Sequence, residues 1–387
     1  MQVIPYGRQD IDQADLQAVL EVLQSDWLTQ GPAILHFEEV VARYCRTRHT
    51  LAVANATAAL HLACRALGLG PGDLLWTSPN TFVASANCAR YCGANVDFVD
   101  IDPRTYNMSV TALEAKLQEA EKAGGLPKIV VPVHFAGQSC DMAAIKKLAD
   151  RYGFAIVEDA SHAVGAHYLD TMVGSCQYSD ITVFSFHPVK IITTGEGGML
   201  LTNRQDLYDS LALLRSHGIT RDPAAMTTPS EGPWYYQQVE LGYNYRITDI
   251  QAALGASQMR RLDAFVARRR ELAQRYDDLL TNLPVIRPWQ SPDGVSAFHL
   301  YPILLDPEHT SKGRREVFEA LRSSGIGVNV HYIPVHTQPY YQEQGFRPGD
   351  FPAAERYYAG AISLPMFASL GDAEQDRVVT ALAEALR

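Results

Sequence analysis

The stretch TVFSFHPVKIITTGEGGM, residues 182–199, is the part of this 387-residue chain from which its fold and chemistry can be worked out. It carries one lysine, Lys190, from an apolar, β-branched run into a Thr-Thr-Gly-Glu-Gly-Gly turn. An ammonium group between apolar segments costs on the order of several kcal/mol unless its charge is removed, and a Schiff base with an aldehyde cofactor removes it. The alternative is a lysine that merely covers a loop, and this stretch alone leaves both open.

Short apolar strands and helical segments alternate on both sides of this stretch. The predicted strands are 74–77, 96–99, 129–133, 155–157, 181–184 and 199–202, and the helices between them include 82–91, 110–123 and 143–152. This alternation predicts an α/β fold, with a mostly parallel sheet covered by helices on both faces. Ligands of such sheets bind beyond the carboxyl ends of the strands.

Polar residues follow several of these strands directly. Residues 55–57, Asn-Ala-Thr, open a helix after the apolar run 51–54, and a helix N-terminus suits a phosphate, although Asn and Thr also cap helices without any ligand. Asp159 ends the strand FAIVED, where a sheltered carboxylate needs a positive partner such as a protonated pyridine nitrogen. A metal ligand or a helix cap is the alternative, but no further Asp, Glu or His cluster completes a metal site, so we expect no metal.

The remaining pattern predicts two domains. A helix capped by Asp12 and a second helix at 35–44 precede the sheet, and 218–232 is a polar surface loop. A long helix runs from about 242 to 283, with a bend near Gly255, and leads to strands 297–305 and 327–332 and helices 314–323 and 373–386. We therefore expect a large domain, 1–255, that includes the N-terminal segment 1–12, and a smaller α/β domain, 256–387, joined by the long helix.

Composition narrows the class of partner and the compartment. A net charge of −10 and a pI of about 5.6 argue against nucleic acid or an anionic membrane as the main partner. The six cysteines have no metal-finger spacing, and the N-terminus lacks the features of a signal peptide. No apolar run is long enough to span a bilayer. We expect a cytoplasmic protein.

Several motifs together carry a family resemblance. They are N-ATAALHLA, TSPNTFVASANCA, ED-ASH-AVGA, SFHPVK with TTGEGGML, and GYNYRITDIQAALG. In this order they resemble the DegT/DnrJ/EryC1/StrS family of sugar aminotransferases, and the resemblance runs from Ile4 to Leu386. It implies the fold type I architecture of pyridoxal-phosphate-dependent transferases, with pyridoxal 5′-phosphate, alternating with pyridoxamine phosphate, as cofactor.

The resemblance also implies roles for single residues. Lys190 would bind the cofactor covalently and then move a proton between the substrate and the cofactor, while Asp159 would pair with the pyridinium nitrogen. Phe82 would stack on the ring, and His162 would contact its other side near the phenolic oxygen. Relatives often have Gln at the position of His162, and those with His in place of the lysine are sugar dehydratases; Lys190 therefore favours transamination.

The phosphate would be held by four residues, which are Ala56, Thr57, Ser185 and Asn244. In relatives the position of Asn244 reaches across from a second subunit. The resemblance therefore implies a homodimer with shared active sites.

A finer resemblance lies in IPYGRQ, SDWLTQGP, VPVHFAGQ, VNVHYIPVHTQPYY and ISLPMF. These segments resemble enzymes of pseudaminic acid biosynthesis that aminate C4 of UDP-2-acetamido-2,6-dideoxy-β-L-arabino-hex-4-ulose with glutamate as donor, giving UDP-4-amino-4,6-dideoxy-N-acetyl-β-L-altrosamine. The implied sugar-nucleotide pocket consists of Tyr6, Trp27, Leu28, Thr29, His331 and Tyr332. Tyr6 and Trp27 could instead anchor the core, and His331 could be a core histidine. The alternative functions are the same chemistry on another nucleotide 4-keto sugar, of the bacillosamine or legionaminic acid type, or a non-catalytic regulator that binds the cofactor or a sugar nucleotide.

Overall fold

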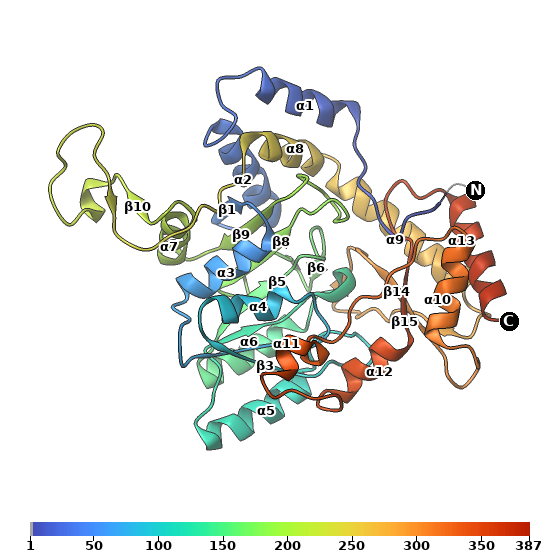
Figure 1. Ribbon diagram of the computed structural model, residues 1–387. Helices are drawn as coiled ribbons and strands as arrows, with labels where there is room; N and C mark the ends of the chain where they lie inside the picture. Colours follow the sequence, from blue (N-terminus) through green and yellow to red (C-terminus); the bar gives the residue numbers. More distant parts are fainter. Residues whose placement is uncertain (1–2) are drawn as a thin grey trace.

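The computed structural model describes residues 3–387, and a seven-stranded sheet forms its centre (Figure 1). The strand order is β1-β9-β8-β5-β4-β2-β3, and only β9 runs against its neighbours. The strands are β1 (His49–Val53), β2 (Leu74–Thr77), β3 (Asn95–Phe98), β4 (Ile129–Val131), β5 (Ala155–Asp159), β8 (Ile181–Ser185) and β9 (Gly198–Thr202). The predicted mostly parallel sheet and the α/β class are confirmed.

Helices cover both faces of this sheet because successive strand residues point to opposite sides. Ile129 and Val131 pack on the side of α3, α4 and α7, whereas Val130 packs on the side of α5 and α6. Helices α2 and α8 lie on the same face as α5 and α6, where they cover Ala52 of β1 and Phe184 of β8. The bounds are α2 (Pro32–Cys45), α3 (Ala56–Ala66), α4 (Ala84–Tyr91), α5 (Val110–Ala123), α6 (Met142–Tyr152), α7 (Gln205–Arg215) and α8 (Asp249–Met259).

The long helical pattern is two helices, α8 and α9 (Leu262–Leu279), and the chain turns at Arg260 and Arg261. The predicted bend near Gly255 is therefore wrong. A Cβ at Gly255 would lie 2.6 Å from the ring of Phe37, so this glycine allows α8 to pack closely on α2. The turn is held instead by the Arg261 guanidinium, which forms ion pairs at 2.6–3.1 Å with three carboxylates of the N-terminal segment, those of Asp10, Asp12 and Asp15.

The C-terminal unit is built on a three-stranded antiparallel sheet, β12-β14-β15. Its elements are β12 (Val285–Ile286), β14 (Tyr301–Leu305), α10 (Arg314–Ser323), β15 (Ala361–Leu364) and α13 (Asp372–Ala385). The predicted strand at 327–332 is wrong: this segment has one isolated bridge, from Asn329 to Ser363, and a second, from Ile326 to Ile4, lies just before it. Val328 is buried by side-chain packing, and Val330 is half-buried.

The division into 1–255 and 256–387 stays a prediction. Leu262 and Phe265 of helix α9 pack in the core between the large sheet and helices α2 and α8. Leu272 and Tyr276, further along the same helix, pack in the core of the C-terminal unit. Ile4 also lies in the C-terminal core. Both ends of the chain therefore contribute to the packing of the smaller unit.

The other elements lie around these two cores. Helix α1 (Gln13–Leu23), capped by Asp12 as predicted, covers α8, and a two-stranded arm of β10 (Ile219–Thr220) and β11 (Gln237–Gln238) projects from the body (Figure 1). The rest are β6 (His167–Tyr168), β7 (Thr171–Met172), β13 (Gly294–Val295), α11 (Pro339–Gln342) and α12 (Pro352–Gly360), with short 3-10 turns at Phe135–Gly137, Pro223–Ala225 and Val335–Thr337. Among residues 3–387 no helix is long and apolar enough to cross a membrane.

Candidate active site

A cavity of about 840 Å³ lies beyond the carboxyl ends of the strands, where the pattern of strands and helices predicted a ligand. It brings together ten of the predicted site residues from both parts of the chain. They are Tyr6, Ala56, Thr57, Phe82, Asp159, His162, Ser185, Lys190, His331 and Tyr332.

Lys190 lies in the turn after β8, where its backbone N–H donates to the carbonyl of His187 at 2.9 Å. The side chain is half-buried and borders the cavity. Burial lowers the pKa of its ammonium group to about 8, against the opposing effect of the nearby Asp159 carboxylate. A substantial fraction of the amine is therefore neutral near pH 8, which is the form that attacks a carbonyl carbon.

Asp159 is 5% exposed and is fixed through both its backbone and its side chain. Its carbonyl accepts from the backbone N–H of His134 at 3.0 Å. One carboxylate oxygen, Oδ2, accepts from the hydroxyl of Ser85 at 2.6 Å, and Oδ1 accepts from the backbone N–H of Ser161 at 3.1 Å. The carboxylate is therefore held in place by a donor on each oxygen. Such a buried anion beside a cavity fits the protonated nitrogen of a pyridine ring.

The amino end of α3 forms an anion site, which we name the phosphate cradle: the backbone of Asn55, Ala56 and Thr57, with Ser185. The Asn55 side chain accepts from the N–H of Ala58 at 2.8 Å, while the first N–H groups of a helix have no acceptor within it. Gly198 on β9 permits this arrangement, because a Cβ there would lie 2.7 Å from the nitrogen of Ala56. The cradle fits the phosphate of pyridoxal phosphate.

His162 is held in one neutral form by its neighbours. Its Nδ1 accepts from the backbone N–H of Ala136 at 3.3 Å, so Nε2 carries the proton and donates to the hydroxyl of Tyr332 at 3.0 Å. Burial, with smaller effects of Lys190 and His331, places the pKa of His162 well below its ordinary value. His162 therefore acts here as a neutral hydrogen-bonding group.

His331 and Tyr6 bring the C-terminal unit and the N-terminal segment to the same cavity. The rings lie 5.6 Å apart, and Nδ1 of His331 is 2.8 Å from the hydroxyl of Ser363. Burial lowers the pKa of His331 to about 3, so its ring is neutral at physiological pH. Neutral ring nitrogens, a phenol and an aromatic face suit a polar, uncharged group such as a sugar.

Four predicted residues do not line the cavity of a single chain. Asn244 pairs with Ser216, and Thr29 pairs with Thr248, both through isolated bridges. Trp27 and Leu28 stand 54% and 48% exposed on the surface. Their predicted roles stay predictions.

Some residues at the site were not predicted from the sequence. Ser85 reaches Asp159 from α4, and His299 lines the cavity with its ring 4.4 Å from that of His162. Ser85 lies in α4, and no local pattern of the sequence marks it as a partner of Asp159. His299 lies in the segment 297–305, whose first residues are not part of a strand, and nothing in the local pattern marks it.

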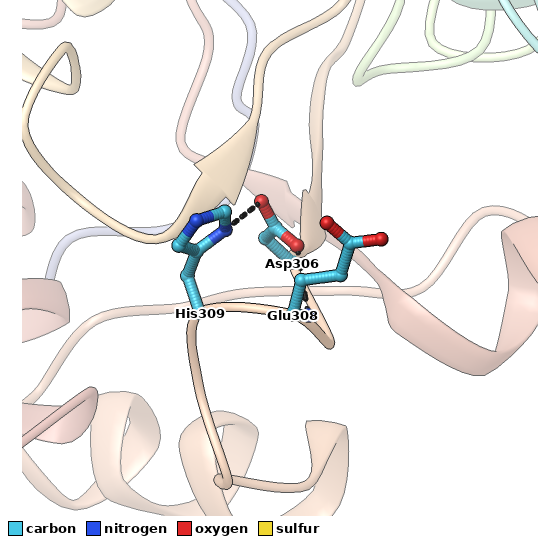
Figure 2. Close-up of side chains that lie close together, drawn as sticks. All are labelled: Asp306, Glu308 and His309. Atoms are coloured by element: carbon cyan, nitrogen blue, oxygen red, sulfur yellow. Dashed lines mark hydrogen bonds and ion pairs between the residues drawn. The ribbon is translucent and has the colours of Figure 1, made fainter.

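One group among residues 3–387 has the geometry of a metal site, and it does not line this cavity. Asp306, Glu308 and His309 lie together on an exposed turn after β14 (Figure 2). Asp306 accepts from the backbone N–H of Glu308 at 3.0 Å and lies 2.8 Å from Nδ1 of His309. These bonds are those of an aspartate that stabilises its own turn.

Comparison with known proteins agrees with this geometry. The family model of the DegT/DnrJ/EryC1/StrS aminotransferase family matches residues 9–383. The spore coat polysaccharide biosynthesis protein SpsC of Bacillus subtilis is 42% identical over 99% of this chain and 97% of that protein. Among solved structures, Helicobacter pylori PseC, an aminotransferase involved in the biosynthesis of pseudaminic acid, is 31% identical, with a TM-score of 0.90 over 100% of this chain and 99% of that one.

A putative sugar aminotransferase of Streptococcus pneumoniae, solved with pyridoxamine phosphate, is 29% identical, with a TM-score of 0.89 over 99% of this chain and 98% of that one. The same protein solved with pyridoxal phosphate matches with a TM-score of 0.88 at 28% identity. The fold is therefore the type I fold of these transferases. The chain belongs to the DegT/DnrJ/EryC1/StrS aminotransferase family and is a sugar aminotransferase dependent on pyridoxal phosphate.

Proposed function

We propose that this enzyme transfers an amino group from glutamate to C4 of UDP-2-acetamido-2,6-dideoxy-β-L-arabino-hex-4-ulose, giving UDP-4-amino-4,6-dideoxy-N-acetyl-β-L-altrosamine, a step of pseudaminic acid biosynthesis. The observation that carries this choice is the likeness to PseC over the whole chain. It is supported by the position of Tyr6, His331 and Tyr332 on the same cavity as Lys190 and Asp159.

The chemistry divides between the cofactor and the chain. When bound, pyridoxal phosphate stores the electron pair released as the amino group moves between substrates. Lys190 Nζ, neutral in part because burial lowers its pKa to about 8, takes the proton from the reacting carbon of the substrate and returns it. Asp159 would pair with the ring nitrogen, and the phosphate cradle would hold the phosphate group.

Two further side chains orient the ring. Phe82 borders the cavity with its ring exposed, in a position to stack on a planar group. His162 presents a neutral ring whose proton is directed to Tyr332. These contacts would hold the ring in place while Lys190 moves the proton. A fixed geometry lowers the entropic cost of bringing the reacting groups together.

The enzyme would act as a homodimer with shared active sites. The apolar side chains Leu16, Leu20 and Leu23 of α1 are exposed in the single chain, next to Trp27 and Leu28 in the loop that follows. An exposed apolar surface of this kind is typical of a subunit interface. A second copy packed there would bring Asn244 and the residues at 27–29 toward the cavity of its partner.

We place the reaction in the cytoplasm. All six cysteines are buried and unpaired, as is typical of a reducing compartment.

A second substrate is favoured by a different observation. The identity to SpsC, 42%, exceeds that to PseC, and SpsC is described as a protein of spore coat polysaccharide biosynthesis. The same site chemistry would then act on another nucleotide 4-keto sugar, of the bacillosamine or legionaminic acid type.

To test the proposal, the purified enzyme is assayed with glutamate and one of two substrates, followed by NMR of the product. The substrates are the L-arabino 4-keto sugar named above and the D-configured 4-keto sugar of the bacillosamine or legionaminic acid type. Turnover of the L-arabino epimer to the C4 amine supports the proposal. Turnover of only the D-configured epimer replaces it with the second candidate. Lys190→Ala serves as the control and should abolish both turnover and the absorption of the lysine-bound cofactor.

A further inference from the structure

Ser85 has no role in the reaction proposed for Lys190 and Asp159, yet it contacts Asp159 directly. It lies in α4 with 0% of its surface exposed, and its hydroxyl is 2.6 Å from Oδ2 of Asp159. A second hydroxyl, that of Thr81, lies 2.8 Å from the Ser85 oxygen and belongs to a residue that borders the cavity. Both hydroxyls are therefore part of one buried chain that ends on the Asp159 carboxylate.

The direction of this chain follows from the donors available. An ionised carboxylate has no proton to give, so the Ser85 O–H must donate to Asp159. The Ser85 hydroxyl has one proton, so the Thr81 O–H must donate to Ser85. The other acceptor within reach of Ser85, the carbonyl of Phe82, lies 3.4 Å away and competes weakly.

The same contacts fix the plane of the carboxylate. The backbone of Asp159 is held on both sides, by its N–H to the carbonyl of Pro132 at 2.9 Å and by its carbonyl to the N–H of His134 at 3.0 Å. Only the side-chain torsions remain free, and donors from Ser85 and Ser161 on the two oxygens remove that freedom. Without Ser85, Oδ2 would lose the only side-chain donor that the described residues give it.

We propose that Ser85, supported by Thr81, is a positioning residue for the aminotransfer reaction. It directs the Asp159 carboxylate through its hydrogen bond to Oδ2, so that Asp159 faces the ring nitrogen of the cofactor and keeps that nitrogen protonated. This inference rests on the proposed role of Asp159. Ser85 itself touches neither substrate nor cofactor, and it acts only through the carboxylate.

The test uses the loaded enzyme with Ser85→Ala. Nitrogen-15 NMR of enzyme loaded with ring-labelled pyridoxal phosphate reports whether the ring nitrogen carries a proton. We expect the wild-type nitrogen to stay protonated through neutral pH and the Ser85→Ala nitrogen to lose its proton at a lower pH. The kcat should fall by about ten-fold or more, the effect of one lost hydrogen bond to a charged group, with the KM of both substrates unchanged.

The matched control is Cys88→Ala, in the same helix one turn further on. Cys88 is also fully buried, and its thiol contacts the carbonyl of Ser85 and leaves the Ser85 hydroxyl in place. This variant should keep the wild-type NMR signal and kcat. Thermal unfolding of the cofactor-free proteins separates a folding defect from an effect on the ring nitrogen.

The outcomes distinguish this inference from the proposed function. If Asp159→Asn deprotonates the ring nitrogen while Ser85→Ala behaves like Cys88→Ala, the role of Ser85 is overturned and that of Asp159 stands. If Asp159→Asn leaves the nitrogen protonated, the role of Asp159 fails, and that of Ser85 fails with it. Loss of the proton in both variants supports the inference.

Discussion

Because burial lowers the pKa of Lys190, the reactivity of its amine should depend on pH near neutrality. The folded pKa of about 8 lies below the ordinary value of 10.5, so the neutral amine predominates above about pH 8. Because the neutral amine attacks the aldehyde, the rate at which cofactor-free enzyme binds pyridoxal phosphate covalently should rise with pH through about 8 and then level off. Stopped-flow absorbance measures this rate, and a midpoint near that of a free lysine would contradict the prediction.

His162 should tolerate one substitution and not another. Glutamine can accept from the N–H of Ala136 and donate to the hydroxyl of Tyr332, as the neutral imidazole does. Leucine can do neither and leaves both groups without a partner, which should lower kcat/KM by about ten-fold. Steady-state kinetics of His162→Gln and His162→Leu check this, and equal losses in both variants would show that the two hydrogen bonds do not matter.

The residues with the clearest local signals could be predicted from sequence. Lys190 and Asp159 each stand out as a charge next to an apolar strand, and the cavity brings them together. Ser85 could not be predicted, because its partner is 74 positions away and a serine in an alanine-rich helix has no local pattern that marks it. Likewise, no local pattern places the N–H of Ala136 against His162.

Among the elements, β9 and α3 approach each other more closely than side chains allow. A Cβ on Gly198 would lie 2.6 Å from the carbonyl carbon of Asn55 and 2.7 Å from the nitrogen of Ala56. Gly198→Ala should therefore displace the phosphate cradle, destabilise the fold by about 1–3 kcal/mol and weaken cofactor binding. Calorimetry and equilibrium dialysis with pyridoxal phosphate measure the two effects.

Gly70→Ala is the matched control for this change, because a Cβ there meets nothing within 4 Å. It should leave both cofactor affinity and stability near the wild-type values. Unchanged cofactor binding in Gly198→Ala would show that the cradle does not depend on this close approach.

Elements whose bounds follow from a local sequence pattern were easier to predict than elements whose position depends on contacts with distant residues. Helix 110–123 and helix 314–323 have the predicted bounds. The turn between α8 and α9 was misplaced because Arg261 is held by carboxylates about 250 positions earlier, at Asp10 and Asp15. The segment 327–332 has the alternation of a strand, but the position beside β14 belongs to β15.

At the scale of the whole molecule, the proposed homodimer with shared active sites predicts complementation between two inactive variants. Lys190→Ala removes the lysine of its own site, and Asn244→Ala would damage the site of the partner. Mixed after dissociation, half of the dimers would be hybrids with one intact site each, so about a quarter of wild-type activity should return. No recovery, with hybrid formation verified by mass spectrometry, would place Asn244 outside the partner's site.

The apolar surface of α1 gives a second prediction at this scale. Leu20→Glu puts a charge on that surface, and the enzyme should then sediment as a monomer and lose activity, because each site would lack its partner's residues. Ile286→Glu is the control, since Ile286 is equally exposed, at 45%, on the C-terminal unit. Analytical ultracentrifugation compares the two, and dimers in both variants would exclude α1 from the interface.

The contact between Gly198 and the amino end of α3 also bears on protein synthesis. Strand β1 joins the central sheet through β9, and the cradle begins only two residues after β1. A nascent chain that ends before residue 198 therefore has neither the neighbour that secures β1 nor the backbone that closes the anion site. We therefore expect that the nascent chain can bind pyridoxal phosphate only after residue 198 has left the ribosome, when about half of the polypeptide has been made.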